Sequence, residues 1–124
     1  MIPQKRRILC VGDDSDADAL IQTVLGLAGY DVVPAGTLAD GLRLAAVGHF
    51  ALLIIKEKCP DGRGVDFVRG LRAAGSKAPV IVHSDDVRES MRSEALEAGA
   101  DLFLGKCELG ELVATVRRLT AAGQ

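Results

Sequence analysis

The alternation of short apolar runs with amphipathic stretches constrains the fold of this chain more than any other feature. Five apolar runs fall at residues 8–11, 32–35, 52–55, 80–82 and 102–104. Runs this short and continuous are typical of parallel strands that are covered on both faces. The stretches between them carry apolar residues at helical spacing, as in Ala17, Leu20, Ile21, Val24, Leu25 and Ala28, or in Leu38, Leu42 and Ala45. Alternating strands and helices imply a parallel sheet with right-handed crossovers.

Signals at the helix boundaries agree with this division. Ser15 with Asp18, and Thr37 with Asp40, resemble capping boxes that have Asp in place of Glu. Glycines that suit a left-handed C-cap follow the helical stretches, at Gly29, Gly48, Gly75, Gly99 and Gly123. We therefore predict one α/β domain over residues 5–122, with a doubly wound, flavodoxin-like, five-stranded parallel sheet in the strand order 2-1-3-4-5.

Composition and charge exclude several classes of partner. The aromatic content of 3% and the net charge of −2 argue against nucleic-acid binding by base stacking or by attraction to phosphates. No apolar stretch approaches the roughly 20 residues that a membrane-spanning helix needs. Cys10, Cys59 and Cys107 are too widely spaced for a metal motif or a disulfide framework. We expect a cytoplasmic protein with no nucleic-acid or membrane partner.

Chemically capable side chains follow the predicted strands at one edge of the sheet. The first strand runs into Asp13 and Asp14, the third ends in Lys56, the fourth in Ser84, and the fifth near Lys106. Sites in such sheets lie at the carboxyl ends of the strands, beside the first and third. We expect these side chains to converge on one pocket, although two acids, a hydroxyl and two lysines fit several chemistries.

Three stretches together resemble a response-regulator receiver domain of the chemotaxis-receiver type over nearly the whole chain: "RRILCVGDDSDADALIQTVLGLAGYDVV", "KAPVIVHSDD" and "EALEAGADLFLGK". The resemblance implies three acids that hold Mg²⁺, one of which takes a phosphoryl group from a histidine kinase. It also implies a Ser/Thr and a Lys that bind phosphoryl oxygens, at the positions of Ser84 and Lys106. Phe103 matches the aromatic that reports phosphorylation, and Asp13 matches the second acid of the family's acidic pair.

The chain departs from the family pattern at two acids. Gly12 stands where the first acid of the pair belongs, and Lys56, counted back from Pro60, stands at the phosphoacceptor position. A divalent cation about 4 Å from an ammonium is opposed by about 8 kcal/mol at an effective dielectric of ~20. We predict a degraded Mg²⁺ site, no cofactor and no phosphotransfer, with Lys56 paired to Asp13 or Asp14.

Structural roles also account for these residues. Lys56 could extend its ammonium to water from the strand end, and Asp13 and Asp14 could simply begin the first helix. Ser84 could cap the helix that follows it, and Phe103 could serve only in the core. Cys107 stands where the family has a proline, so we expect a trans bond after the lysine that precedes it.

The resemblance and its departures predict an atypical receiver, or pseudo-receiver, of two-component phosphorelay signal transduction. We expect it to be no enzyme, with no catalytic residue, and to act through protein–protein interaction independently of phosphorylation. The family implies a histidine kinase, another receiver or an output domain as partner, on the face formed by the fourth helix, fifth strand and fifth helix. That face covers residues 87–121 and could also support a homodimer. Its candidate exposed charges are Arg88, Arg92, Glu111, Arg117 and Arg118.

Three other functions stay open. A working receiver could use Glu57 or Asp61 as phosphoacceptor, although strand alternation points Glu57 away from Lys56. An enzyme could use Lys56 as an amine nucleophile, although nearby aspartates oppose the lowered pKa that this requires. Flavin binding is disfavoured because the first strand leads into acids, which repel a phosphate.

Overall fold

The computed structural model describes residues 6–12, 16–105 and 110–122, and five of its strands form one parallel sheet. The strands are β1 (Arg7–Val11), β2 (Asp31–Ala35), β3 (Leu52–Lys56), β6 (Val80–Ser84) and β7 (Leu102–Gly105). They lie in the order β2-β1-β3-β6-β7, so the predicted topology is confirmed. All five predicted apolar runs fall within these strands, and the carboxyl ends of β1, β3, β6 and β7 share one edge.

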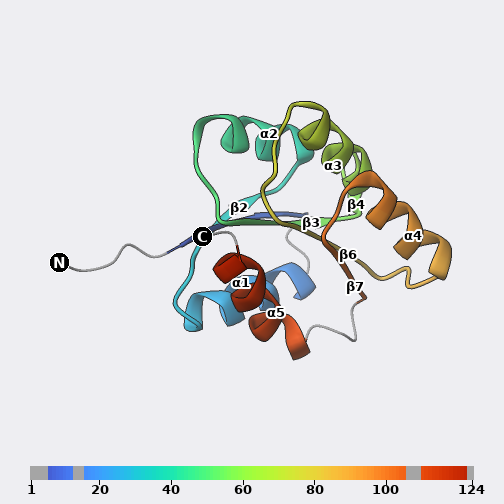
Figure 1. The fold of residues 1–124 in the computed structure, drawn as a ribbon. Helices are drawn as coiled ribbons and strands as arrows, with labels where there is room; N and C mark the ends of the chain where they lie inside the picture. Colours follow the sequence, from blue (N-terminus) through green and yellow to red (C-terminus); the bar gives the residue numbers. More distant parts are fainter. Residues whose placement is uncertain (1–5, 13–15, 106–109, 123–124) are drawn as a thin grey trace.

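In the described part of the chain, five helices cover the two faces of the sheet. They are α1 (Asp16–Leu27), α2 (Leu38–Val47), α3 (Gly64–Ala73), α4 (Glu89–Ala98) and α5 (Leu112–Ala122). Helices α2, α3 and α4 cover one face, and α1 and α5 cover the other (Figure 1). None of the helices in the described part of the chain has the length and apolar character needed to span a bilayer.

Side chains of β3 alternate between two cores. Leu53 and Ile55 join the core beneath α2, α3 and α4, whereas Leu52 and Ile54 join the core beneath α1 and α5. Both faces are therefore apolar, which explains why the strand reads as an unbroken apolar run. The same alternation carries Lys56, at the end of the strand, toward the α1 side.

The start of α2 is fixed by two side chains. Thr37 caps the helix as predicted, because its hydroxyl accepts a hydrogen bond from the Asp40 backbone N–H at 3.1 Å. Asp61, far along the chain, accepts from the N–H groups of Leu38 and Ala39 at 2.8 and 3.0 Å. These backbone hydrogen bonds lower the pKa of the Asp61 carboxyl.

The glycine C-caps are confirmed in part. Positive φ angles occur at Gly29 (100°), Gly75 (90°) and Gly99 (114°), where a side chain would be strained. The prediction was wrong for Gly48, whose φ of −119° is extended backbone, and its N–H donates to the Leu44 carbonyl. Gly123 and Ser15 lie outside the described residues.

Other sequence expectations failed at the surface. Leu20 and Leu42, which fit the helical apolar stripes, are 53% and 49% exposed. The stretch after β3 has the turn that its sequence indicates, at Pro60 and Asp61, but this turn also joins an unpredicted antiparallel ribbon of β4 (Lys58–Cys59) and β5 (Gly62–Arg63). This ribbon places Arg63 beside α4, where it contacts Glu94.

Candidate functional site

Lys56 turns inward at the carboxyl edge of the sheet and forms an ion pair. Its Nζ lies 3.8 Å from Oδ2 of Asp18, which belongs to the first turn of α1. The Lys56 side chain is only 14% exposed and that of Asp18 only 7%. The ammonium is therefore largely withdrawn from water rather than extended into it.

The Asp18 carboxylate also reaches the neighbouring strand. Its Oδ1 lies 3.3 Å from Nε2 of His83, a buried residue that is directly opposite Lys56 in the β3–β6 register. Burial and the negative charge of Asp18 raise the pKa of the Cys10 thiol to about 12, so this cysteine stays protonated. A buried carboxylate is costly without partners, and here the ends of β3 and β6 supply them.

Gly12 makes room for this carboxylate. A Cβ added at Gly12 would lie 2.6 Å from both oxygens of Asp18, far closer than carbon and oxygen can approach. An acidic side chain at position 12 and the Asp18 carboxylate therefore compete for the same space. The predicted alignment with the family puts an acid at position 12, and in the structure the Asp18 carboxylate from α1 occupies the space beside this glycine.

The sequence pattern does not mark Asp18 as a site residue, because an acid in the first turn of a helix reads as a helix-start signal. The sequence did contain one signal, an unbalanced positive charge. The third strand ends on Lys56, and the residue that follows the adjacent strand is a glycine, which offers no charge to balance the lysine. Asp13, Asp14, Lys106 and Cys107 lie outside the described residues. The predicted pairing of Lys56 with Asp13 or Asp14 stays a prediction.

Ser84 lies at the pocket edge, at the end of β6, and is buried. Its hydroxyl accepts a hydrogen bond from the Asp86 backbone N–H at 3.0 Å, which shapes the turn after the strand. The N-cap of α4 is Arg88, which makes no side-chain capping bond. Ser84 therefore organises the turn and does not cap the helix.

Phe103 is fully buried in the centre of β7. The guanidinium carbon of Arg92 lies 5.2 Å from the centroid of its ring, and Arg92 donates a hydrogen bond to the Phe103 carbonyl at 3.2 Å. Arg92 is therefore partly buried, whereas the sequence suggested an exposed charge. The other candidate charges of this face are exposed: Arg88, Glu111, Arg117 and Arg118.

The two carboxylates considered as alternative phosphoacceptors are both engaged elsewhere. Glu57 is buried and accepts hydrogen bonds from the Val65 backbone N–H at 2.9 Å and from Arg63 Nε at 2.6 Å. Asp61 binds the start of α2. Strand alternation thus points Glu57 away from Lys56, as expected.

An open pocket of about 740 Å³ adjoins the ion pair. It lies between the β4–β5 ribbon, the turn after β6 and the start of α4, and its lining includes Lys56, Ser84, Arg88 and Met91. Within the described ranges, no three His, Cys, Asp or Glu side chains are grouped so that they could hold a metal ion.

Comparison with known proteins agrees with the resemblance to receiver domains. The family model described as "Response regulator receiver domain" matches residues 8–117. The KDP operon transcriptional regulatory protein KdpE of Escherichia coli (strain K12) is 40% identical over 111 residues, which cover 89% of this chain and 49% of that protein. The transcriptional regulatory protein PrrA of Mycobacterium tuberculosis is 39% identical over 114 residues, 91% of this chain and 49% of that protein. The chain thus spans about half the length of these curated relatives.

Solved structures agree with the fold. The receiver domain of the Francisella response regulator 1452 superposes with a TM-score of 0.91 at 24% identity, covering 97% of this chain and all of that one (100%). The non-phosphorylated HemR receiver domain from Leptospira biflexa gives a TM-score of 0.83 at 25% identity, covering 94% of this chain and 95% of that one.

Proposed function

This chain belongs to the response regulator receiver domain family of two-component systems, and we propose that it acts through protein–protein contacts without being phosphorylated. The observation that carries the proposal is the Lys56–Asp18 ion pair, because the resemblance to the family assigns the phosphoacceptor to position 56. A protonated lysine has three N–H donors and no lone pair to attack phosphorus. Unlike an aspartate, it cannot form an acyl phosphate.

Loss of the metal site is part of the same proposal. Mg²⁺ requires oxygen ligands in near-octahedral geometry, whereas Gly12 offers no carboxylate and the Asp18 carboxylate already faces an ammonium and an imidazole. The cation would also have to approach the ammonium of Lys56. At about 4 Å, repulsion would oppose it by about 8 kcal/mol at an effective dielectric of ~20. The described residues therefore do not fit a Mg²⁺ ion.

The ion pair would stabilise the pocket in place of the metal ion and the phosphoryl group. In the family pattern, a pocket with excess negative charge is balanced by a bound cation. Here a lysine supplies the positive charge from within the chain, and Asp18 supplies a carboxylate from α1. We propose that the pocket is thereby held in one state that needs neither Mg²⁺ nor phosphorylation.

The proposed partner is a histidine kinase, another receiver or an output domain, and the proposed binding face is formed by α4, β7 and α5. Exposed Arg88, Glu111, Arg117 and Arg118 lie on this face, which could also join two copies of the chain. We propose a non-enzymatic role in the cytoplasm. The wide spacing of Cys10, Cys59 and Cys107, which fits no disulfide framework, suits that reducing compartment.

Titration with Mg²⁺, followed by ¹H–¹⁵N NMR, tests the metal part of the proposal. The natural chain should show no saturable shifts at the ends of β1 and β3. A Gly12→Asp, Asp18→Ala, Lys56→Asp variant, which restores two acids and removes the competing carboxylate, should show them. Saturable shifts at these strand ends in the natural chain would overturn the proposal.

A further inference from the structure

We propose that a network of charged side chains centred on Arg63 clamps α4 against the end of β3 and sets the position of that helix without a phosphoryl group. The network is separate from the Lys56–Asp18 pair, because strand alternation sends Lys56 toward α1 and Glu57 toward α3 and α4. We call it the Arg63 clamp and define it by Glu57, Arg63 and Glu94.

The fixed end of the clamp is Glu57. Its backbone N–H donates to the His83 carbonyl at 2.9 Å, and its own carbonyl accepts from the Gly64 N–H at 2.8 Å. Its carboxylate accepts from the Val65 backbone N–H and from Arg63, and the residue is only 7% exposed. Backbone and side chain are therefore both held, and the buried negative charge requires the guanidinium beside it.

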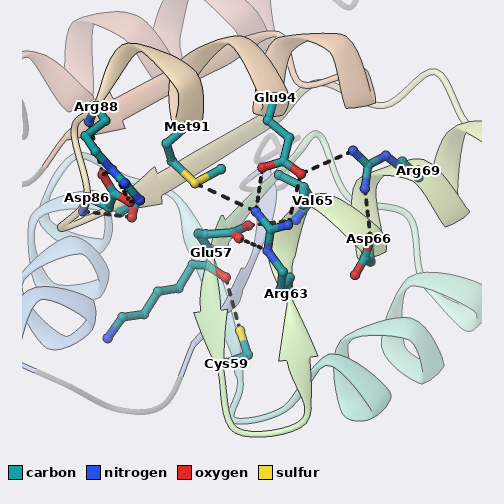
Figure 2. Close-up of polar contacts among 12 residues, drawn as sticks. Glu57, Cys59, Arg63, Val65, Asp66, Arg69, Asp86, Arg88, Met91 and Glu94 are labelled. Atoms are coloured by element: carbon teal, nitrogen blue, oxygen red, sulfur yellow. Dashed lines mark hydrogen bonds and ion pairs between the residues drawn. The ribbon is translucent and has the colours of Figure 1, made fainter.

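Arg63 bridges this fixed point to α4, as Figure 2 shows. Its Nε donates to Glu57 Oε2 at 2.6 Å, while its Nη1 and Nη2 donate to the two carboxylate oxygens of Glu94 at 2.9 and 2.6 Å. A two-point arginine–carboxylate pair is directional as well as strong, so it fixes orientation and distance. Nη2 also lies 3.9 Å from the sulfur of Met91, one turn earlier on α4.

Helix α3 supports the outer side of the clamp. Arg69 lies 3.5 Å from Glu94 and donates to Asp66 at 2.8 Å (Figure 2). The side chains of Arg63 and Arg69 are 47% and 48% exposed, so solvent weakens these outer contacts. The inner contact between Arg63 and buried Glu57 is screened least. The contribution of each contact to holding α4 in place should therefore decrease from Glu57 outward to Asp66.

Within the described residues, helix α4 contributes only one large apolar side chain, Met91, to the core on this side. Its buried residues are Met91, Ala95 and Ala98, and two alanines bury little apolar surface. Its N-cap, Arg88, makes no side-chain capping bond. On the far side, Arg92 holds α4 to Phe103 of β7. The charged clamp therefore adds a directional polar link between α4 and the end of β3 to the apolar core that Met91, Ala95 and Ala98 share with Ile55.

The clamp connects the phosphoacceptor position to the proposed partner face. Glu57 directly follows Lys56, and α4 is one of the three elements of that face. This functional reading rests on the proposed function, whereas the clamp itself is a property of the charged side chains. Breaking the clamp should loosen α4 without affecting the core beneath α1 and α5.

Hydrogen exchange of backbone amides, measured by mass spectrometry, tests the clamp. Glu94→Gln should raise the exchange of α4 peptides about tenfold, as expected for weakening of one or two charge-assisted hydrogen bonds, and leave α1 and α5 unchanged. Glu97→Gln, an exposed site on the same helix, is the matched control. Equal α4 exchange in both variants would overturn the proposal.

A second variant separates the clamp from general stability. Arg63→Gln alone would leave Glu57 buried and unpaired, and could unfold the chain. Glu57→Gln with Arg63→Met removes both charges together, which is often neutral for stability, and the glutamine amide oxygen can still accept from the Val65 backbone N–H. This double variant should keep the unfolding midpoint and still show faster α4 exchange. An unchanged unfolding midpoint together with unchanged hydrogen exchange of the α4 amides would contradict the clamp. The measurement needs neither Mg²⁺ nor phosphate, so its failure would leave the phosphorylation prediction standing.

Discussion

Replacing Lys56 by methionine should destabilise the chain through the carboxylate that it leaves behind. At the observed 3.8 Å between Lys56 Nζ and Asp18 Oδ2, two unit charges attract by about 4 kcal/mol at an effective dielectric of ~20. Methionine keeps the apolar stem but leaves Asp18 buried without the ammonium. We expect a loss of about 3 kcal/mol in the free energy of unfolding, as is typical when one partner of a buried pair is removed.

A double-mutant cycle isolates this interaction. Asp18→Asn should also be destabilising, whereas Asp18→Asn combined with Lys56→Met should cost less than the sum of the two, with a coupling energy of about 2 kcal/mol. Urea unfolding followed by far-UV circular dichroism is suitable, since the chain has no Trp. Lys58→Met, at an exposed lysine two residues further on, is the control and should change little. Additive effects, within about 0.5 kcal/mol, would refute the ion pair.

Three further predictions concern other parts of the molecule. Gly12→Asp with Lys56→Asp should unfold at lower urea than the same variant carrying Asp18→Ala, because a Cβ at position 12 lies 2.6 Å from the Asp18 oxygens; equal midpoints would contradict this competition. The lowered pKa of Asp61 means that its contribution is present above the unfolded value of 3.8 and is lost as the pH falls through the lower folded value. Asp61→Ala should therefore lose stability at pH 6 and show a smaller further loss by pH 3, measured by thermal unfolding; a parallel pH profile would argue against the α2 cap. With its pKa raised to about 12, Cys10 should resist iodoacetamide at pH 8 until the chain unfolds, and rapid labelling of the native chain, located by peptide mass spectrometry, would contradict its burial.

The sequence was sufficient to predict the topology of the sheet and the face of the sheet to which its side chains point. Five apolar runs, each bounded by helical spacing, favour the flavodoxin-like strand order, and the alternation along β3 places Lys56 and Glu57 on opposite sides. These features are predictable because they depend on local periodicity and on the rule that sites lie at the carboxyl ends of the strands.

The charge partners were harder to predict. Asp18 reads as an acid at a helix start, and only the folded structure shows that its carboxylate lies against Gly12 and Lys56. The contact between Arg63 and Glu94 joins residues 31 positions apart and depends on the short ribbon on either side of the Pro60–Asp61 turn. Neither follows from periodicity, because each depends on how separate elements pack in three dimensions.

Intact-mass measurement after incubation with Mg²⁺ and acetyl phosphate tests the central claim most directly. The natural chain should keep its mass, while the Gly12→Asp, Asp18→Ala, Lys56→Asp variant should gain one phosphoryl group. A phosphoryl group on the natural chain would contradict the account, and mapping the modified residue would identify the carboxylate that accepts it.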